Sequence, residues 1–183
     1  MISLTSTIKY AVFSIKTLRE MAVDAIQQRD LDQKAQLTLD YAQYWRTHPE
    51  LHASSCQSES PNTTPFFPSP RMGPDPPSKI KTTKIEYTLH GIATAESYAI
   101  DLFWDIILRF HDQIPYSKEY SLEFYQDMME IVEQEAQHFI SWRDRLATMG
   151  VKLGDYPSND TLWQYAEQTK GKKAAWLSNM FNC

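Results

Sequence analysis

The chain has 183 residues, of which 42% are hydrophobic, 13% aromatic and 22% charged, as expected for one globular domain with a sizeable core. Its 18 Lys and Arg against 23 Asp and Glu give a formal net charge of -5, and no basic run could neutralise a row of phosphates. These numbers argue against electrostatic binding of nucleic acid. The two cysteines, Cys56 and Cys183, are too few for a disulfide framework or a thiolate metal site, which favours a reducing compartment.

The sequence predicts no membrane-spanning segment. Its most apolar stretch, residues 98–110, is interrupted by Asp101, Asp105 and Arg109 and is too short to cross a bilayer. The N-terminal residues lack the compact apolar core and small-residue cleavage site of a secretion signal. We therefore expect a cytoplasmic protein, with a mitochondrial location as the alternative.

Residues 1–48 are predicted to form N-terminal helices. From residue 5 to residue 47 the sequence contains neither proline nor glycine, and its apolar residues recur every three or four positions. The first helix carries the stripe from Ile8 to Ile26 and breaks near Asp30. Asp32 is then placed to cap a second helix, which ends before Pro49.

Residues 49–79 are a proline-rich connection. Eight of the ten prolines lie here, together with many Ser and Thr, and this composition cannot sustain a helix or a strand ladder. Two readings stay open. The segment is either a flexible linker or a strap that Phe66 and Phe67 hold against the helical body.

Residues 80–183 are predicted to form a long helical hairpin followed by a short C-terminal helix. The apolar stripe of the first long helix comprises Ile85, Leu89, Ile92, Ala99, Phe103, Ile107 and Phe110. That of the second comprises Leu122, Tyr125, Met128, Val132, Phe139, Trp142 and Leu146. The short connection at residues 111–119 forces the two helices to be antiparallel. Gly150 ends the second helix, and Asp160 is placed to cap a helix from Thr161 to about Gln168. No strand-like alternation is present, so the fold class is all-α.

Three polar residues interrupt the apolar stripes. Glu96 stands where the first stripe calls for an apolar residue, and Glu135 and His138 lie three residues apart on the second. Glu96 precedes Pro115 by 19 residues and Glu135 follows it by 20. At roughly 1.5 Å of rise per residue, the two carboxylates reach nearly the same height on facing helices. We expect these side chains to meet in the interior.

Two carboxylates in an apolar interior need a counter-charge, and a divalent metal ion supplies one. Carboxylate oxygens with an imidazole nitrogen suit iron, manganese or zinc, and Glu-x-x-His is the ligand pattern of di-iron and di-manganese bundles. The predicted metal ligands are therefore Glu96, Glu135 and His138. His90, next to the first stripe, either supports a ligand by a hydrogen bond or is a polar residue near a helix end. The alternative is a buried Glu/His polar network without metal.

The sequence contains no motif that indicates another kind of catalytic chemistry. It contains no Gly-x-Ser-x-Gly elbow, no glycine-rich phosphate loop and no Cys beside a His in a helical segment. The remaining acidic residues of the second long helix, Glu123, Glu130 and Glu133, are expected at the surface. No residue is assigned a catalytic role.

Several segments resemble one known family. They are residues 89–96 with 99–102, residues 124–139, residues 153–157 with Leu162 and Trp163, and the prolines between residues 68 and 76. Together they are similar to the ferritin-like family catalogued as domain of unknown function 455, over residues 15–173. The resemblance implies a ferritin-like helical bundle with a di-metal carboxylate centre, in which Glu96, Glu135 and His138 match the ligand positions.

The chain departs from the family pattern in three places. Thr94 and Asn159 stand where the family has His. The family also continues through two more helices, which bring another Glu and a second Glu-x-x-His motif, whereas this chain ends at Cys183. We therefore expect an incomplete bundle, produced by truncation or alternative splicing.

The resulting functional hypothesis is a ferritin-like metal-binding helical protein, a remnant or isoform of a di-iron or di-manganese bundle that acts as an oxidoreductase on an unknown substrate. Truncation puts the enzymatic activity, and even the metal, of this chain in doubt. Partner helices or a second copy would cover the exposed face of the hairpin, and a homodimer would combine four Glu and two His. The alternative is a non-enzymatic helical interaction module.

Overall fold

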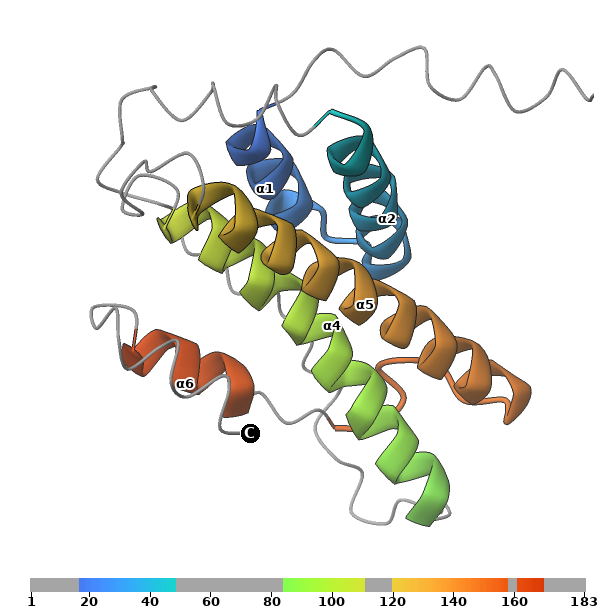
Figure 1. The fold of residues 1–183 in the computed structure, drawn as a ribbon. Coiled ribbons are helices and arrows are strands. Elements are labelled where there is room, and N and C mark those ends of the chain that lie inside the picture. The colour runs from blue at the N-terminus through green and yellow to red at the C-terminus, as the bar shows by residue number, and fades with distance from the viewer. Residues whose placement is uncertain (1–16, 49–83, 111–119, 158–160, 170–183) are drawn as a thin grey trace, which may run out of the picture.

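The computed structural model describes residues 17–48, 84–110, 120–157 and 161–169 (Figure 1). Within these ranges the chain forms helices packed against one another and no strand, so the all-α prediction is confirmed. The helices are α1 (Leu18–Gln27), α2 (Leu31–Thr47), α4 (Lys84–Phe110), α5 (Tyr120–Thr148) and α6 (Thr161–Thr169). None of the described helices combines the length and apolar character needed to cross a membrane. The predicted linker or strap at residues 49–79 lies outside the described residues.

Capping side chains set the beginnings of α1 and α2. Thr17 accepts a hydrogen bond from the Glu20 N–H, and the Glu20 carboxylate accepts one from the Thr17 N–H, so that a capping box starts α1. Asp30 caps α2 by accepting from the Gln33 N–H at 2.9 Å. The prediction that Asp32 is this cap was wrong. The two aspartates are equally suitable by type, and the second helix begins at Leu31, two residues earlier than a cap at Asp32 implies.

Helices α4 and α5 form the predicted antiparallel hairpin, which runs across the whole molecule in Figure 1. They have 27 and 29 residues. Gly150 has a φ of 74°, a left-handed conformation that glycine adopts without strain, and it ends α5 as expected. The connection at residues 111–119 and the expected cap of α6 at Asp160 lie outside the described residues.

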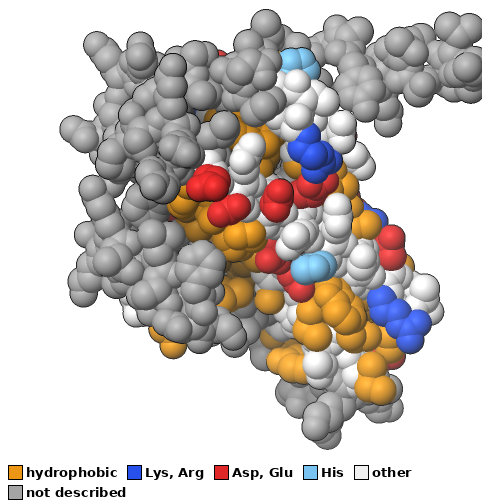
Figure 2. All heavy atoms as spheres, in the orientation of Figure 1, with side chains coloured by type: hydrophobic (Ala, Val, Ile, Leu, Met, Phe, Trp, Pro, Cys, Tyr) orange, Lys and Arg blue, Asp and Glu red, His pale blue; other side chains and the backbone are white. Residues whose placement is uncertain are grey.

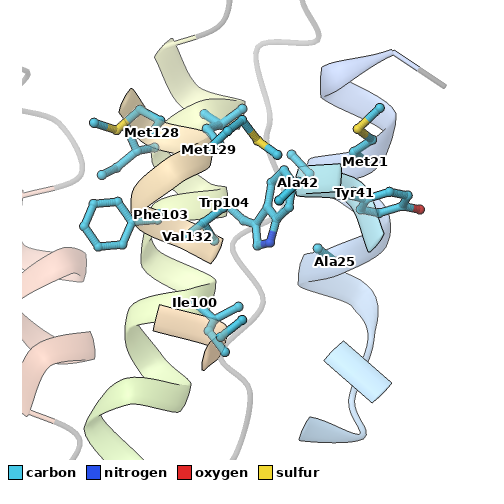
Figure 3. Close-up of a cluster of buried hydrophobic side chains, with 14 of the residues drawn as sticks. Met21, Ala25, Tyr41, Ala42, Ile100, Phe103, Trp104, Met128, Met129 and Val132 are labelled. Atoms are coloured by element: carbon cyan, nitrogen blue, oxygen red, sulfur yellow. The ribbon is translucent and has the colours of Figure 1, made fainter. Parts of the chain in front are cut away.

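The main core lies where the hairpin meets α1 and α2. Figure 3 shows Trp104 of α4 directed between Met129 of α5 and the α2 residues Tyr41 and Ala42. Trp104 is fully buried, and its Nε1 donates to Thr38 Oγ1 of α2 at 3.0 Å. This indole therefore contributes apolar packing and also satisfies its polar atom inside the core.

The buried face of α4 differs from the predicted stripe. Its most enclosed residues include Ala93, Ser97, Ile100 and Trp104, each at most 1% exposed and none of them in that stripe. Of the stripe itself, Ile107 is buried whereas Ile85 is 65% exposed. The buried face is offset from that stripe because α1 packs against α4 in addition to α5, so α4 is enclosed on two sides. The side of α4 that carries Glu96 is consequently only half-buried.

An ion pair is enclosed between α2 and α4. Lys34 Nζ contacts Asp101 Oδ1, and their side chains are 0% and 2% exposed. Each charge loses its hydration on folding, so each depends on the other for compensation. The pair fixes the position of α2 along α4.

Replacement of Lys34 by Met should destabilise the protein by about 3 to 5 kcal/mol, because Asp101 then loses its buried counter-charge. The double variant Lys34→Met/Asp101→Leu should lose much less than the sum of the two single variants. Urea unfolding followed by circular dichroism measures these differences. If the double variant lost as much unfolding free energy as the two single variants together, Lys34 and Asp101 would not be energetically coupled.

Candidate metal centre

The structure brings together the three residues that the sequence singled out as metal ligands. Glu96 lies near the middle of α4, and Glu135 and His138 lie one turn apart on α5. His138 Nδ1 is 3.7 Å from Glu96 Oε2 and 3.7 Å from Glu135 Oε2. One ligand atom from each residue lies within 4.8 Å of the other two.

The group lies at the surface of the hairpin and not in the interior that the sequence analysis expected. The side chains of Glu96 and Glu135 are each 20% exposed, and that of His138 is 55% exposed. Figure 2 shows a histidine beside acidic side chains on this face, bordered by hydrophobic side chains. The expectation of a fully buried group was wrong, because α1 and α2 cover other sides of the hairpin.

The carboxyl groups of Glu96 and Glu135 repel each other when both are charged. Burial, a hydrogen bond with Glu96 and the negative charge of Glu96 together raise the pKa of Glu135 to about 8. At neutral pH a proton therefore compensates part of the charge. A bound cation would perform the same compensation.

The geometry suits a single metal ion. Metal–ligand bonds of about 2.0 to 2.2 Å place neighbouring ligand atoms roughly 3 to 3.5 Å apart, slightly closer than the separations found here. Small side-chain rotations would close the difference. Three protein ligands leave coordination positions open to water or another ligand, as in catalytic metal sites.

His90 is buried at 1% exposure, and its contacts lie at the loop that follows α5. Its Nε2 accepts a hydrogen bond from the Gly154 N–H at 2.8 Å, and its ring meets Tyr156 edge-on at 5.3 Å between centroids. Among the described residues His90 forms no hydrogen bond with Glu96, Glu135 or His138, so the expected support of a metal ligand is not found. It anchors the 151–157 loop against α4.

Thr94 also lacks a role as a ligand. It is 2% exposed, and its hydroxyl donates to the His90 carbonyl at 2.9 Å within α4. The family resemblance expects His at this position, so the chain lacks one imidazole near Glu96. Asn159, the other departure, lies outside the described residues.

Sequence reasoning missed a hollow between α2 and α5. It has a volume of about 250 Å³, and its lining includes Trp45, Met129, Arg46 and Glu133. Arg46 and Glu133 form an ion pair there, and this pairing raises the pKa of Arg46. The sequence analysis expected Glu133 at the surface, but its side chain is only 16% exposed, and no sequence signal indicated its partner on α2.

The fold and this group define an all-α protein whose central hairpin presents two carboxylates and an imidazole. Comparison then places the chain in a family. The family described as "Protein of unknown function (DUF455)" matches residues 27–180, and the chain belongs to it.

An uncharacterized protein of Haemophilus influenzae (strain ATCC 51907 / DSM 11121 / KW20 / Rd) is 32% identical over 97 residues, which are 52% of this chain and 34% of that protein. The chain thus matches about a third of the length of this curated relative. No solved structure gives a significant match.

Acid should weaken the attachment of the 151–157 loop through His90. Burial lowers the pKa of His90 below its ordinary value of 6.5, and the charge of Asp155 opposes this shift only in part. Below that ordinary value the unfolded chain binds a proton that the folded chain resists, so stability falls as the pH falls.

The matched variant His90→Gln keeps an acceptor for the Gly154 N–H but does not titrate. Between about pH 7.5 and 5.5, the wild type should therefore lose more unfolding free energy than this variant, as measured by urea unfolding at each pH. Equal losses of unfolding free energy in the two proteins would show that His90 does not cause the pH dependence of stability.

Proposed function

We propose that this protein is a ferritin-like metal-binding helical protein in which Glu96, Glu135 and His138 bind a divalent metal ion. The observation that carries the proposal is the convergence of three metal-ligating side chains from two helices within 4.8 Å. The long α4–α5 hairpin supports the ferritin-like assignment, since bundles of this class present carboxylate and Glu-x-x-His ligands from facing helices.

The alternative, a buried polar network in a non-enzymatic interaction module, fits these contacts less well. A network of this kind needs buried groups joined by hydrogen bonds of normal length. His138 is 55% exposed, and both of its carboxylate contacts, at 3.7 Å, are too long for hydrogen bonds. The imidazole is therefore close enough to share a cation with the carboxylates but does not itself hold them by hydrogen bonds.

The donor set favours iron, manganese or zinc, because it combines two hard carboxylates with one borderline imidazole. Each of these ions supplies Lewis acidity, and iron and manganese can also change oxidation state. Within the proposal, the chain is related to di-iron or di-manganese oxidoreductase bundles. Its own residues would hold the ion and leave an open side for a further ligand.

Metal titration tests the proposal. Isothermal titration of the metal-free chain with Zn²⁺ or Mn²⁺ should show one ion per chain, and His138→Ala and Glu135→Gln should each abolish saturable binding. Binding to the folded state alone should also raise the unfolding free energy by about 2.7 kcal/mol at an ion concentration 100 times the Kd.

Two exposed positions on the same helix provide matched controls. Asp127→Asn removes a carboxylate and Gln137→Ala shortens a polar side chain, and neither residue belongs to the converging group. Both variants should bind metal as the wild type does. Failure of the wild type to bind either ion, or equal losses in the controls, would refute the site.

A further inference from the structure

The Glu96, Glu135 and His138 group opens away from the helices that cover the rest of the hairpin. Helix α2 packs on α5 at Arg46 and Glu133 and on α4 at Lys34 and Asp101. His138 follows Glu133 by five residues and Glu96 precedes Asp101 by five, and each spacing turns about 140° around its helix, so the exposed imidazole lies away from both contacts with α2. The open coordination positions of a bound ion would therefore face solvent.

Apolar side chains lie on the same helical faces as this group. On α4, Ile85 and Ile92 lie on the same helical face as Glu96, because spacings of 11 and 4 residues return to nearly the same side. On α5, Trp142 follows His138 by four residues and so lies on the same helical face. All three apolar side chains retain exposure, and that of Ile85 reaches 65%. These three side chains form the apolar rim of the group, and exposed apolar side chains favour contact with another surface.

The ligand set of one chain is incomplete for the ions that it suits. Three side chains supply three of the four to six ligands that such ions take, and each carboxylate has a second oxygen that can bridge to another ion. Two copies related by a twofold axis through this face would combine four Glu and two His on four helices. A complete four-helix bundle uses this same set to hold two metal ions.

Charge makes such an association depend on metal. Each metal-free copy presents two acidic groups to its partner, so like charges face each other. Two divalent ions bring four positive charges against four carboxylates and remove the repulsion. We propose that a second copy of this chain docks on this face and that the two copies share two divalent cations. This inference rests on the proposed metal binding.

Sedimentation velocity of the full chain, with added Mn²⁺ or with chelator, tests the proposal. With one equivalent of Mn²⁺ the mass should double from 21.3 kDa, and with chelator it should return to that of one chain. The electron paramagnetic resonance spectrum of the dimer should show magnetic coupling between two Mn²⁺ ions, because shared sites hold ions about 3.5 to 4 Å apart.

A charged residue in the apolar rim should separate the copies. Ile92→Lys, one turn from Glu96, should keep the chain monomeric in Mn²⁺, whereas Gln36→Lys, on the exposed face of α2, should leave the dimer intact. Circular dichroism checks that both variants fold. The coupling in the wild-type spectrum decides the question independently if Ile92→Lys does not fold.

The outcomes separate this inference from the proposed function. One Mn²⁺ per chain with an uncoupled spectrum and an unchanged mass would overturn the dimer and leave the metal site standing. Absence of metal binding would overturn both. A dimer that persists in chelator, or that resists Ile92→Lys in a folded variant, would show that the copies associate elsewhere.

Discussion

The packing of α4 against α5 is the constraint on which the Glu/His group depends. Trp104 fills the space between the hairpin and α2, and Val132 of α5 is fully buried in the same core. Close-packed interiors resist sliding, because a shift of one helix would drive side chains into occupied space. The heights of Glu96 and His138 are therefore determined by the core. The side chains of the Glu/His group meet because the packed apolar core allows only one alignment of α4 and α5.

This arrangement also explains why two carboxyl groups can remain close together without coming apart. Repulsion between Glu96 and Glu135 opposes their approach and, after burial and a hydrogen bond with Glu96, contributes to the raised pKa of Glu135. Both side chains are attached to long helices whose position is set by a far larger buried surface. Groups held in this way by rigid elements are preorganised for a cation, since binding requires little rearrangement.

Sequence periodicity predicted the antiparallel hairpin and the meeting of Glu96 with Glu135 and His138, because these depend on local spacing and on helix rise. The first predicted helix, with its stripe from Ile8 to Ile26, instead begins at Leu18 after the Thr17 cap. Periodicity also did not predict which side of α4 is enclosed. That helix contains buried Asp101 and Asp105, whose charges obscure an apolar stripe. Nor could local spacing pair Lys34 with Asp101, 67 residues away, since only the docking of α2 brings them together. The exposure of His138 likewise depends on where α1 and α2 pack.

The enclosed contact between Lys34 and Asp101 has a further consequence for how the molecule opens. A displacement of α2 by one turn would strand an ammonium and a carboxylate in a medium of low dielectric constant, and partial detachment is therefore heavily penalised. Helix α2 should leave the hairpin as one cooperative unit instead of fraying gradually from one end. Backbone amides of α2 and of the adjoining part of α4 then share a common opening event and exchange their hydrogens together.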